Sequence, residues 1–254
     1  MNTIARLSAL AFAAILALPA APAAVAEEFS KTQRSAIESI VREYLISHPE
    51  VLQEAMVELE KRQTAAAAAK HQAAVKEHAK ALFSSPRQVV LGNPKGNVTF
   101  VEFFDYNCGY CKHAMADMLD LLQTDPNLKV VLKEFPVLGP GSVEAAQVAV
   151  AVRMQAPDKY LEFHKKLLGG RGAADKARAL AVAKDVGLDM AQLEKDMKSP
   201  EVKKTLEEDF KLADALGLNG TPSYVIGKDV VVGAVGLAAL KEKISTARCG
   251  KASC

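Results

Sequence analysis

The sequence lacks three features that would each point to a class of function. Its charge is nearly balanced, because 32 Lys and Arg against 30 Asp and Glu leave a formal net charge of +2. This balance favours neither nucleic acid nor an anionic membrane as a partner. Beyond residue 26 no apolar run approaches the roughly 20 residues that span a bilayer. No cluster rich in Met or His offers metal ligands. The function must therefore be argued from local motifs.

The first 26 residues have the pattern of a secretory signal peptide. Arg6 is the positive n-region, LSALAFAAILAL is a short apolar h-region, and AVA at residues 24–26 is a small-residue cleavage site. The h-region is too short for a membrane anchor. We predict a soluble mature protein that begins at Glu27 and is exported to the periplasm, where disulfides persist.

Residues 27–83 are predicted to form a helical arm in two pieces. The second piece is expected to begin near Pro49, with Ser47 as its cap, and it continues into an alanine-rich stretch. Its apolar stripe is narrow, like a coiled-coil seam, which favours self-association over folding back onto the main domain. The first piece has apolar residues at helical spacing: Ile37, Ile40, Val41, Tyr44 and Leu45.

The rest of the chain alternates between strand and helix patterns. Residues 84–97 are rich in Pro, Gly, Ser and Asn and are predicted to be a linker. Strand, helix and strand follow over 98–141, a long helical region over 142–216, and two short strands and a helix over 217–247. We expect a four-stranded mixed sheet that contains a parallel pair and a hairpin, with the helical region inserted in its middle. Residues 248–254 form a tail.

Two cysteines, Cys108 and Cys111, have the spacing C-x-x-C where a predicted strand meets a predicted helix. The free N–H groups and the dipole of a helix start favour a thiolate at Cys108, while Cys111 lies one turn deeper. The pattern indicates a redox dithiol in which Cys108 attacks and Cys111 resolves. Structural zinc would need Cys249 and Cys254 as well, but C-x4-C in a short tail is a poor match. The polar surroundings argue against two buried core cysteines.

A second motif, Thr221-Pro222, directly precedes a predicted strand. It is weak by itself, because most such prolines are trans. Combined with the dithiol, the inserted helices and the hairpin, it resembles the DsbA-like branch of the thioredoxin superfamily over residues 90–246. The resemblance implies an α/β thioredoxin fold with an inserted helical domain. It also implies a cis Pro222 beside the dithiol and backbone hydrogen bonds from Thr221 to an extended substrate.

The resemblance assigns a role to Glu102, six residues before the first cysteine. An acid in an apolar strand is costly unless it faces water at a sheet edge. In the family an acid at this place is buried beneath the second cysteine and relays its proton. We therefore expect Glu102 beneath Cys111, with Lys133 as a charge partner. Most histidines, including His113 and His164, are expected on helix surfaces.

The mature chain, apart from its tail, resembles the exported Com1-like proteins and the suppressor-of-copper-sensitivity C (ScsC) proteins. The similarity lies in QRSAIESIVREYLISHPEVLQEAMVELEKRQ, the block around CGYC, KEFPVLGPGS and LGLNGTPSYVIG. These relatives imply that the arm is an oligomerisation segment, which favours a homotrimer and leaves a dimer open. Gly109 and Tyr110, expected to contact substrate, match the dipeptide of DsbC-type isomerases.

These features favour a protein disulfide isomerase or reductase that acts on misfolded or disulfide-bonded exported proteins. A membrane thiol reductant would keep it reduced, and no cofactor is expected. A DsbA-like oxidase remains an alternative. Another is a protein of copper tolerance that binds Cu(I) through Cys108 and Cys111. The tail pair, Cys249 and Cys254, is predicted to form a local disulfide, although a part in exchange or copper capture stays open.

Overall fold

The computed structural model describes residues 29–254, so the predicted signal peptide lies outside the described residues. The chain divides into two compact units, the first ending at Glu58 and the second covering Leu59–Cys254. The first unit contains α1 (Lys31–Ser47) and the start of α2 (Glu50–Glu77), which continues into the second unit. None of the described helices is long and apolar enough to cross a membrane.

Helix α1 exposes its apolar side chains to solvent. Its first turn is closed by a capping box, in which Ser30 Oγ accepts from the Gln33 N–H and the Gln33 side chain accepts from the Ser30 N–H. No residue within α1 is buried, and Ile40 is 64% exposed. Helix α2 begins next to Pro49, as predicted, but Ser47 does not cap it. The Ser47 hydroxyl instead donates to the Glu43 carbonyl at 2.7 Å.

The second unit is built on a five-stranded sheet in the order β1-β3-β2-β4-β5. Strands β2 and β3 are parallel, and every other neighbouring pair is antiparallel. The predicted parallel pair and C-terminal hairpin are therefore confirmed. The strands are β1 (Val89–Gly92), β2 (Val98–Phe104), β3 (Leu128–Glu134), β4 (Ser223–Ile226) and β5 (Asp229–Val232).

Strand β1 corrects the predicted four-stranded sheet. It lies within residues 84–97, which were predicted to be a linker, and it pairs antiparallel with β3 at the sheet edge. The strand has only four residues and is flanked by Ser, Pro, Gly and Asn. The turn-forming residues on either side therefore masked the short apolar pattern of the strand, and the segment was predicted to be a linker. Gly92, with φ +71°, ends the strand where a Cβ atom would lie 2.7 Å from the Leu128 carbonyl oxygen.

The two faces of the sheet pack against different helices. Alternate residues such as Phe100, Phe104 and Tyr224 share a core with α4 (Gly109–Thr124) and α10 (Leu237–Cys249). The intervening residues, such as Phe103, pack with the last turn of α2, with α3 (Ala79–Ser84) and with α9 (Pro200–Ala215). This alternation follows from the period of two in a β-strand, and it decides which side chains can reach the dithiol.

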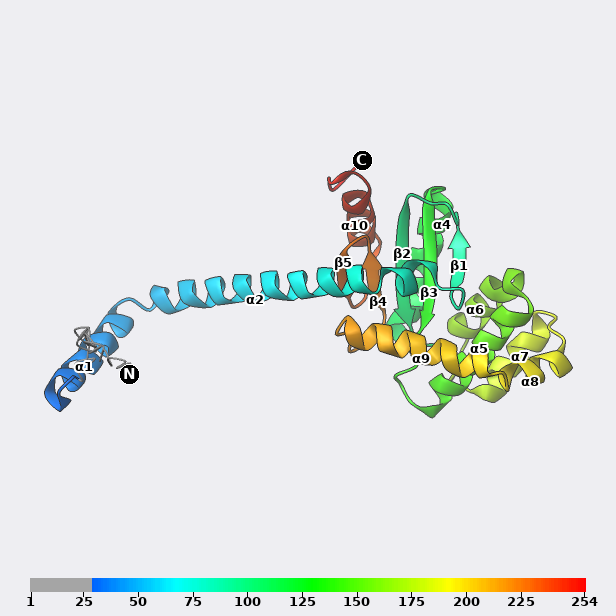
Figure 1. Ribbon diagram of the computed structural model, residues 1–254, viewed down its shortest axis with the longest axis horizontal. Coiled ribbons are helices and arrows are strands. Elements are labelled where there is room, and N and C mark those ends of the chain that lie inside the picture. The colour runs from blue at the N-terminus through cyan, green and yellow to red at the C-terminus, as the bar shows by residue number, and fades with distance from the viewer. Residues whose placement is uncertain (1–28) are drawn as a thin grey trace, which may run out of the picture. The chain divides into compact units, whose positions relative to one another are not determined.

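The predicted helical insertion is confirmed and begins at Pro140. Figure 1 shows its first helices gathered beside the sheet, with α9 running back from them towards β4. Helix α5 is buried on most sides, since eight of its residues are inaccessible to solvent. Before α9 the insertion contains α5 (Pro140–Gln155), the 3-10 turn η1 (Pro157–Lys159), α6 (Tyr160–Gly169), α7 (Lys176–Asp185) and α8 (Met190–Met197).

Candidate active site

The two cysteines of CGYC lie at the N-terminus of α4. Cys108 is the N-cap residue, and its Sγ accepts a hydrogen bond from the Cys111 N–H at 3.4 Å. Cys108 is 7% exposed and Cys111 is 0% exposed, and both thiols are free. Both cysteines are therefore buried, and Cys108 is the more accessible of the two. This matches the predicted order of access.

Thr221 and Pro222 lie beside Cys108, although more than a hundred residues separate them in the chain. The Thr221-Pro222 peptide bond is cis, as the resemblance implied. The Cys108 thiol donates to the Thr221 carbonyl oxygen at 3.2 Å. Pairing of β4 with β2 brings the two segments together, because β2 leads directly into the dithiol loop. The start of β4 therefore forms one wall of the candidate site.

The buried sulfur of Cys111 is a poor acid in this environment. Burial raises the pKa of the Cys111 thiol, and the nearby charges of Glu102 and Cys108 raise it further. Hydrogen bonds from the Asp105 backbone and the Thr221 side chain lower the pKa and oppose part of the burial effect. Cys111 can therefore act as a nucleophile only when a neighbouring group takes its proton.

Glu102 is such a neighbour. Its side chain is buried, with only 3% of the residue exposed, and in the β2–β4 pairing it lies opposite Tyr224 on the α4 face. Burial, and then the charge of Asp117, raise the pKa of Glu102 to about 8. This carboxyl group is therefore protonated at neutral pH and ionises just above it. The burial of Glu102 near Cys111 agrees with the resemblance, and its role as a proton relay stays a prediction.

Lys133 was expected to pair with Glu102, and this is wrong. In the parallel register Glu102 lies opposite Leu132, and Lys133 lies opposite Phe103 on the other face of the sheet. Its ammonium group forms ion pairs with Asp209 at 3.2 Å and Glu208 at 3.6 Å, and it donates to a carbonyl of α3. The sequence separation did not show which residues of the two strands would be aligned.

His164 was expected on a helix surface, and this is also wrong. It is 2% exposed, and burial lowers the pKa of its imidazole to about 3. Its Nδ1 lies 3.3 Å from the Tyr106 hydroxyl, which lies 3.2 Å from the Tyr160 hydroxyl. The Tyr160 hydroxyl in turn donates to Glu134 at 2.8 Å. His113 is exposed on α4, as expected.

The structure adds two groups of residues to the site that sequence reasoning did not find. Asp105 and Asn107 join the dithiol loop to the helical insertion through side-chain hydrogen bonds. The polar DYN triplet before CGYC was their only signal.

Leu138, which is 54% exposed, donates its backbone N–H to Asp105. Val137 is exposed as well, and Tyr110, between the two cysteines in the chain, is 70% exposed. Gly109 is exposed as well.

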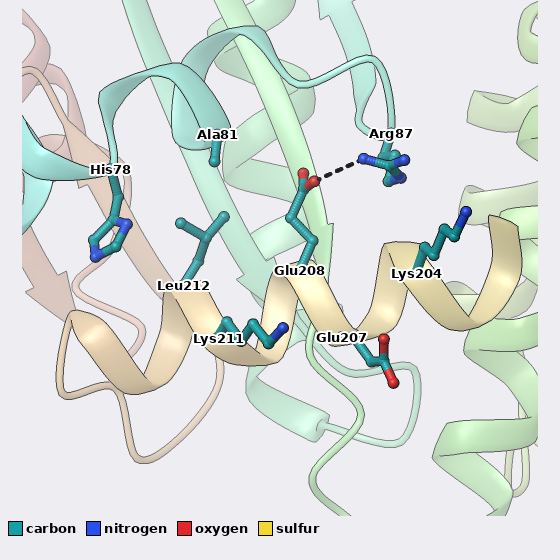
Figure 2. Close-up of a pocket in the computed structure, with 8 residues that line it drawn as sticks. All are labelled: His78, Ala81, Arg87, Lys204, Glu207, Glu208, Lys211 and Leu212. Carbon is teal, nitrogen blue, oxygen red and sulfur yellow. Dashed lines mark hydrogen bonds and ion pairs between the residues drawn. The ribbon is translucent and has the colours of Figure 1, made fainter.

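Two other features lie apart from the dithiol. Cys249 and Cys254 form the predicted tail disulfide. A pocket of about 410 Å³ lies between α3 and α9, on the sheet face opposite α4. Figure 2 shows Glu208 pointing from α9 towards Arg87, with which it forms an ion pair at 3.2 Å. This pocket is lined by charged and apolar side chains and by no cysteine.

The fold and the dithiol geometry define a thioredoxin-fold protein with a helical insertion. Family comparison supports the same class, because the DSBA-like thioredoxin domain matches residues 99–245. The chain therefore belongs to the DsbA-like thioredoxin family, a family of thiol-disulfide oxidoreductases. The copper resistance protein ScsC N-terminal domain matches residues 33–66, within the arm.

Solved structures agree with this assignment. A thioredoxin-like oxidoreductase from Silicibacter pomeroyi is 46% identical, with a TM-score of 0.64, and the match covers 66% of this chain and 96% of that one. Proteus mirabilis ScsC in a transitional conformation is 26% identical, with a TM-score of 0.64, over 87% of this chain and 98% of that one. BcfH of Salmonella enterica Typhimurium is 25% identical, with a TM-score of 0.73, over 85% and 96%.

Curated relatives match a shorter part of the chain. Disulfide bond formation protein D of Bacillus subtilis is 27% identical, over 65% of this chain and 78% of that protein. An Na(+)/H(+) antiporter, NhaA of Herminiimonas arsenicoxydans, is 28% identical over 54% of this chain. The chain spans only 22% of that protein's length.

Proposed function

We propose that this protein exchanges disulfides with exported client proteins through Cys108 and Cys111, mainly as an isomerase or reductase. One observation carries the proposal. The Cys108 sulfur, which is more accessible than that of Cys111, lies at a helix start and 3.2 Å from the Thr221 carbonyl oxygen. A client strand that pairs with the backbone at Thr221 would place its own sulfur next to Cys108.

The chemistry is thiol-disulfide exchange. The Cys108 thiolate attacks one sulfur of a client disulfide, so a bond between Cys108 and the client forms and the client S–S bond breaks. Two routes lead on from this mixed disulfide. In isomerisation, the released client thiolate attacks another disulfide of the client and frees a further client thiolate. That thiolate attacks the client sulfur bonded to Cys108, so a new client S–S bond forms, the bond to Cys108 breaks, and Cys108 leaves as a thiolate. Alternatively, Cys111 loses its proton and attacks Cys108, which reduces the client by two electrons and oxidises the dithiol. A membrane thiol reductant then restores the dithiol.

The cysteine roles are tested by two substitutions. Cys108→Ser should abolish exchange, since no accessible nucleophile remains. Cys111→Ser should trap mixed disulfides, since the attack that releases the client is lost. Non-reducing electrophoresis and mass spectrometry after incubation with scrambled ribonuclease measure both outcomes. Trapping by the Cys108 variant, and loss of activity without trapping by the Cys111 variant, would reverse the assignment.

The arm is the reason to favour isomerisation over simple oxidation. Helix α1 exposes a stripe of apolar side chains that other copies of the chain would cover: Ile37, Ile40, Val41 and Tyr44. An oligomer, which we propose to be a trimer, would hold several dithiols around one client and keep them from an oxidising partner. The Gly109-Tyr110 dipeptide also favours isomerisation, because it matches the dipeptide of the DsbC-type isomerases that this site resembles.

The arm is tested in the full mature chain by Ile40→Glu, with Ser39→Glu as its matched control on the same helix. Light scattering should show dissociation of Ile40→Glu only, because a charge placed in an apolar interface is costly. Ribonuclease refolding should then show loss of isomerisation while simple thiol oxidation survives. Removal of residues 27–58 should have the same effect and spares the core residues Val75 and Leu82. Equal isomerisation by all forms would contradict the role of the arm.

Copper binding and export are further proposals. Cys108 and Cys111 offer two soft sulfur ligands for Cu(I), and competition against a Cu(I) chelator with the Cys108→Ser variant as control would measure this.

Export to the periplasm is supported by the sequence of residues 1–26. Fractionation of cells that produce the full chain would locate it, and a protein that stays with the cytoplasm would contradict export.

A further inference from the structure

The loop between β2 and α4 is held by side-chain hydrogen bonds to the helical insertion. Asp105 is 1% exposed, and both of its carboxylate oxygens accept. Oδ1 accepts from the Asn107 N–H at 2.7 Å and from the Ser142 hydroxyl at 2.7 Å. Oδ2 accepts from the Leu138 N–H at 2.9 Å. The carboxylate therefore joins the dithiol loop to the start of α5.

Asn107 forms the second half of this connection. Its Nδ2 donates to the Ser142 hydroxyl at 2.9 Å and to the Ala174 carbonyl at 2.8 Å. Its Oδ1 accepts from the Ala174 N–H at 2.7 Å. Ala174 lies just before α7, so two separate parts of the insertion hold the residue that precedes Cys108. We call the set of Asp105, Asn107, Ser142 and Ala174 the loop clamp.

The backbone of Asp105 contacts the first cysteine directly. Its carbonyl oxygen accepts from the Cys108 N–H at 3.1 Å. Burial raises the pKa of the Cys111 thiol, and the Asp105 backbone opposes part of this rise. The side chain of Asp105 thus fixes the peptide segment that leads into the dithiol and bonds the Cys108 N–H. A bond to a charged sulfur contributes more than a bond to a neutral one.

We infer that Asp105 is a positioning residue for the resolving step, and that the helical insertion acts on the dithiol through it. This inference rests on the proposed function of Cys108 and Cys111. In the resolving step the Cys111 thiolate attacks Cys108, the Cys108–Cys111 bond forms, and the bond from Cys108 to the client breaks. The client leaves as a thiolate and takes up a proton from water. The loop clamp fixes the Asp105 backbone, and through the bond from the Cys108 N–H to the Asp105 carbonyl it holds Cys108 in place for that attack.

Two substitutions weaken the clamp by different routes. Asp105→Asn keeps the shape of the side chain but replaces one accepting oxygen by a donor, which then faces a donor of the protein. Ser142→Ala removes the hydroxyl that both Asp105 and Asn107 bind. Thr205→Val is the matched control, because Thr205 is as deeply buried as Ser142 and its hydroxyl bonds only to the Glu201 carbonyl within α9.

The assay follows the mixed disulfide between glutathione and Cys108. The full mature protein is reduced and mixed with oxidised glutathione, and acid-quenched samples taken between pH 6 and 9 are analysed by mass spectrometry. We expect the adduct to resolve about tenfold more slowly in Asp105→Asn and several-fold more slowly in Ser142→Ala. The midpoint of the pH–rate profile should move upward in both. Thr205→Val should resolve like the parent.

The outcomes separate the inference from the proposed function. Resolution within twofold of the parent at every pH, in a variant whose unfolding free energy has fallen, would show that the clamp is only structural. If Asp105→Asn does not fold, Ser142→Ala decides alone by the same criterion. If the parent forms no glutathione adduct at Cys108, the proposed function fails and the inference with it. An adduct in the parent with unchanged variants overturns the inference alone.

Discussion

Replacement of Glu102 by Gln should stabilise the folded protein increasingly as the pH rises. Glu102 is buried beneath the dithiol, and burial together with Asp117 raises its pKa from 4.5 to about 8. The folded protein therefore keeps this proton at pH values where the unfolded chain has released it. The stabilisation from the bound proton is complete below pH 4.5 and is lost as the pH rises to about 8.

The size of the effect follows from the two pKa values. Stability falls by about 1.4 kcal/mol for each pH unit between them, because the folded state holds one more proton. At pH 7 the loss amounts to about 3 kcal/mol. Gln resembles the protonated acid and does not titrate, so Glu102→Gln should avoid this loss. The variant and the parent should be equally stable near pH 4.5.

Urea unfolding of both proteins at pH 4.5, 6, 7 and 8 measures the difference. Both carry Cys108→Ser and Cys111→Ser, so that no disulfide forms between these residues during unfolding. Glu194→Gln, on an exposed site of α8, should follow the parent, and Asp117→Asn should recover part of the effect. A gap between Glu102→Gln and the parent that does not widen with pH would refute the reasoning.

Three further predictions concern buried or tail residues. Lys133→Met should lower the free energy of unfolding by about 3 to 5 kcal/mol, measured in urea, because it leaves the buried Asp209 carboxylate without its cation; loss below 1 kcal/mol would contradict this. His164→Phe should reduce the loss of stability as the pH falls from about 6.5 to about 3, because the folded protein keeps this imidazole neutral while the unfolded chain protonates it. An equally large loss of stability in the variant and the parent would argue against this. Joint replacement of Cys249 and Cys254 by Ser should leave the rate of glutathione exchange within twofold, and a larger fall would place the tail in the reaction.

Local patterns predicted the dithiol and every strand of the sheet except β1. The helix start at Cys108 follows from a strand that ends in polar residues before a helical period, and the two arm helices follow from their spacing of apolar residues. These signals are local, since they depend on neighbours within one or two turns. The edge strand β1 was missed for the same reason: its four residues carry too short a pattern to stand out from the turns around it.

The errors at Lys133 and His164 have a different origin. The face on which Lys133 lies depends on the register between β2 and β3, and a shift of one residue would have turned it towards Glu102. The burial of His164 depends on how α6 packs against Tyr106. Neither the register between strands nor the packing of a helix can be predicted from the spacing of residues within a single segment.

The sequence by itself predicted the residues that we propose carry the chemistry. The C-x-x-C pair stands out as a thiol pair at a helix start, whereas Thr221, Pro222 and Glu102 were predicted through the resemblance to the DsbA-like family. Only the tertiary structure decided what surrounds them. The loop clamp from Asp105 to the insertion joins segments that lie far apart in the chain. Hydrogen bonds of this kind depend on the packing of α5 and α7 beside the sheet, which no local pattern encodes.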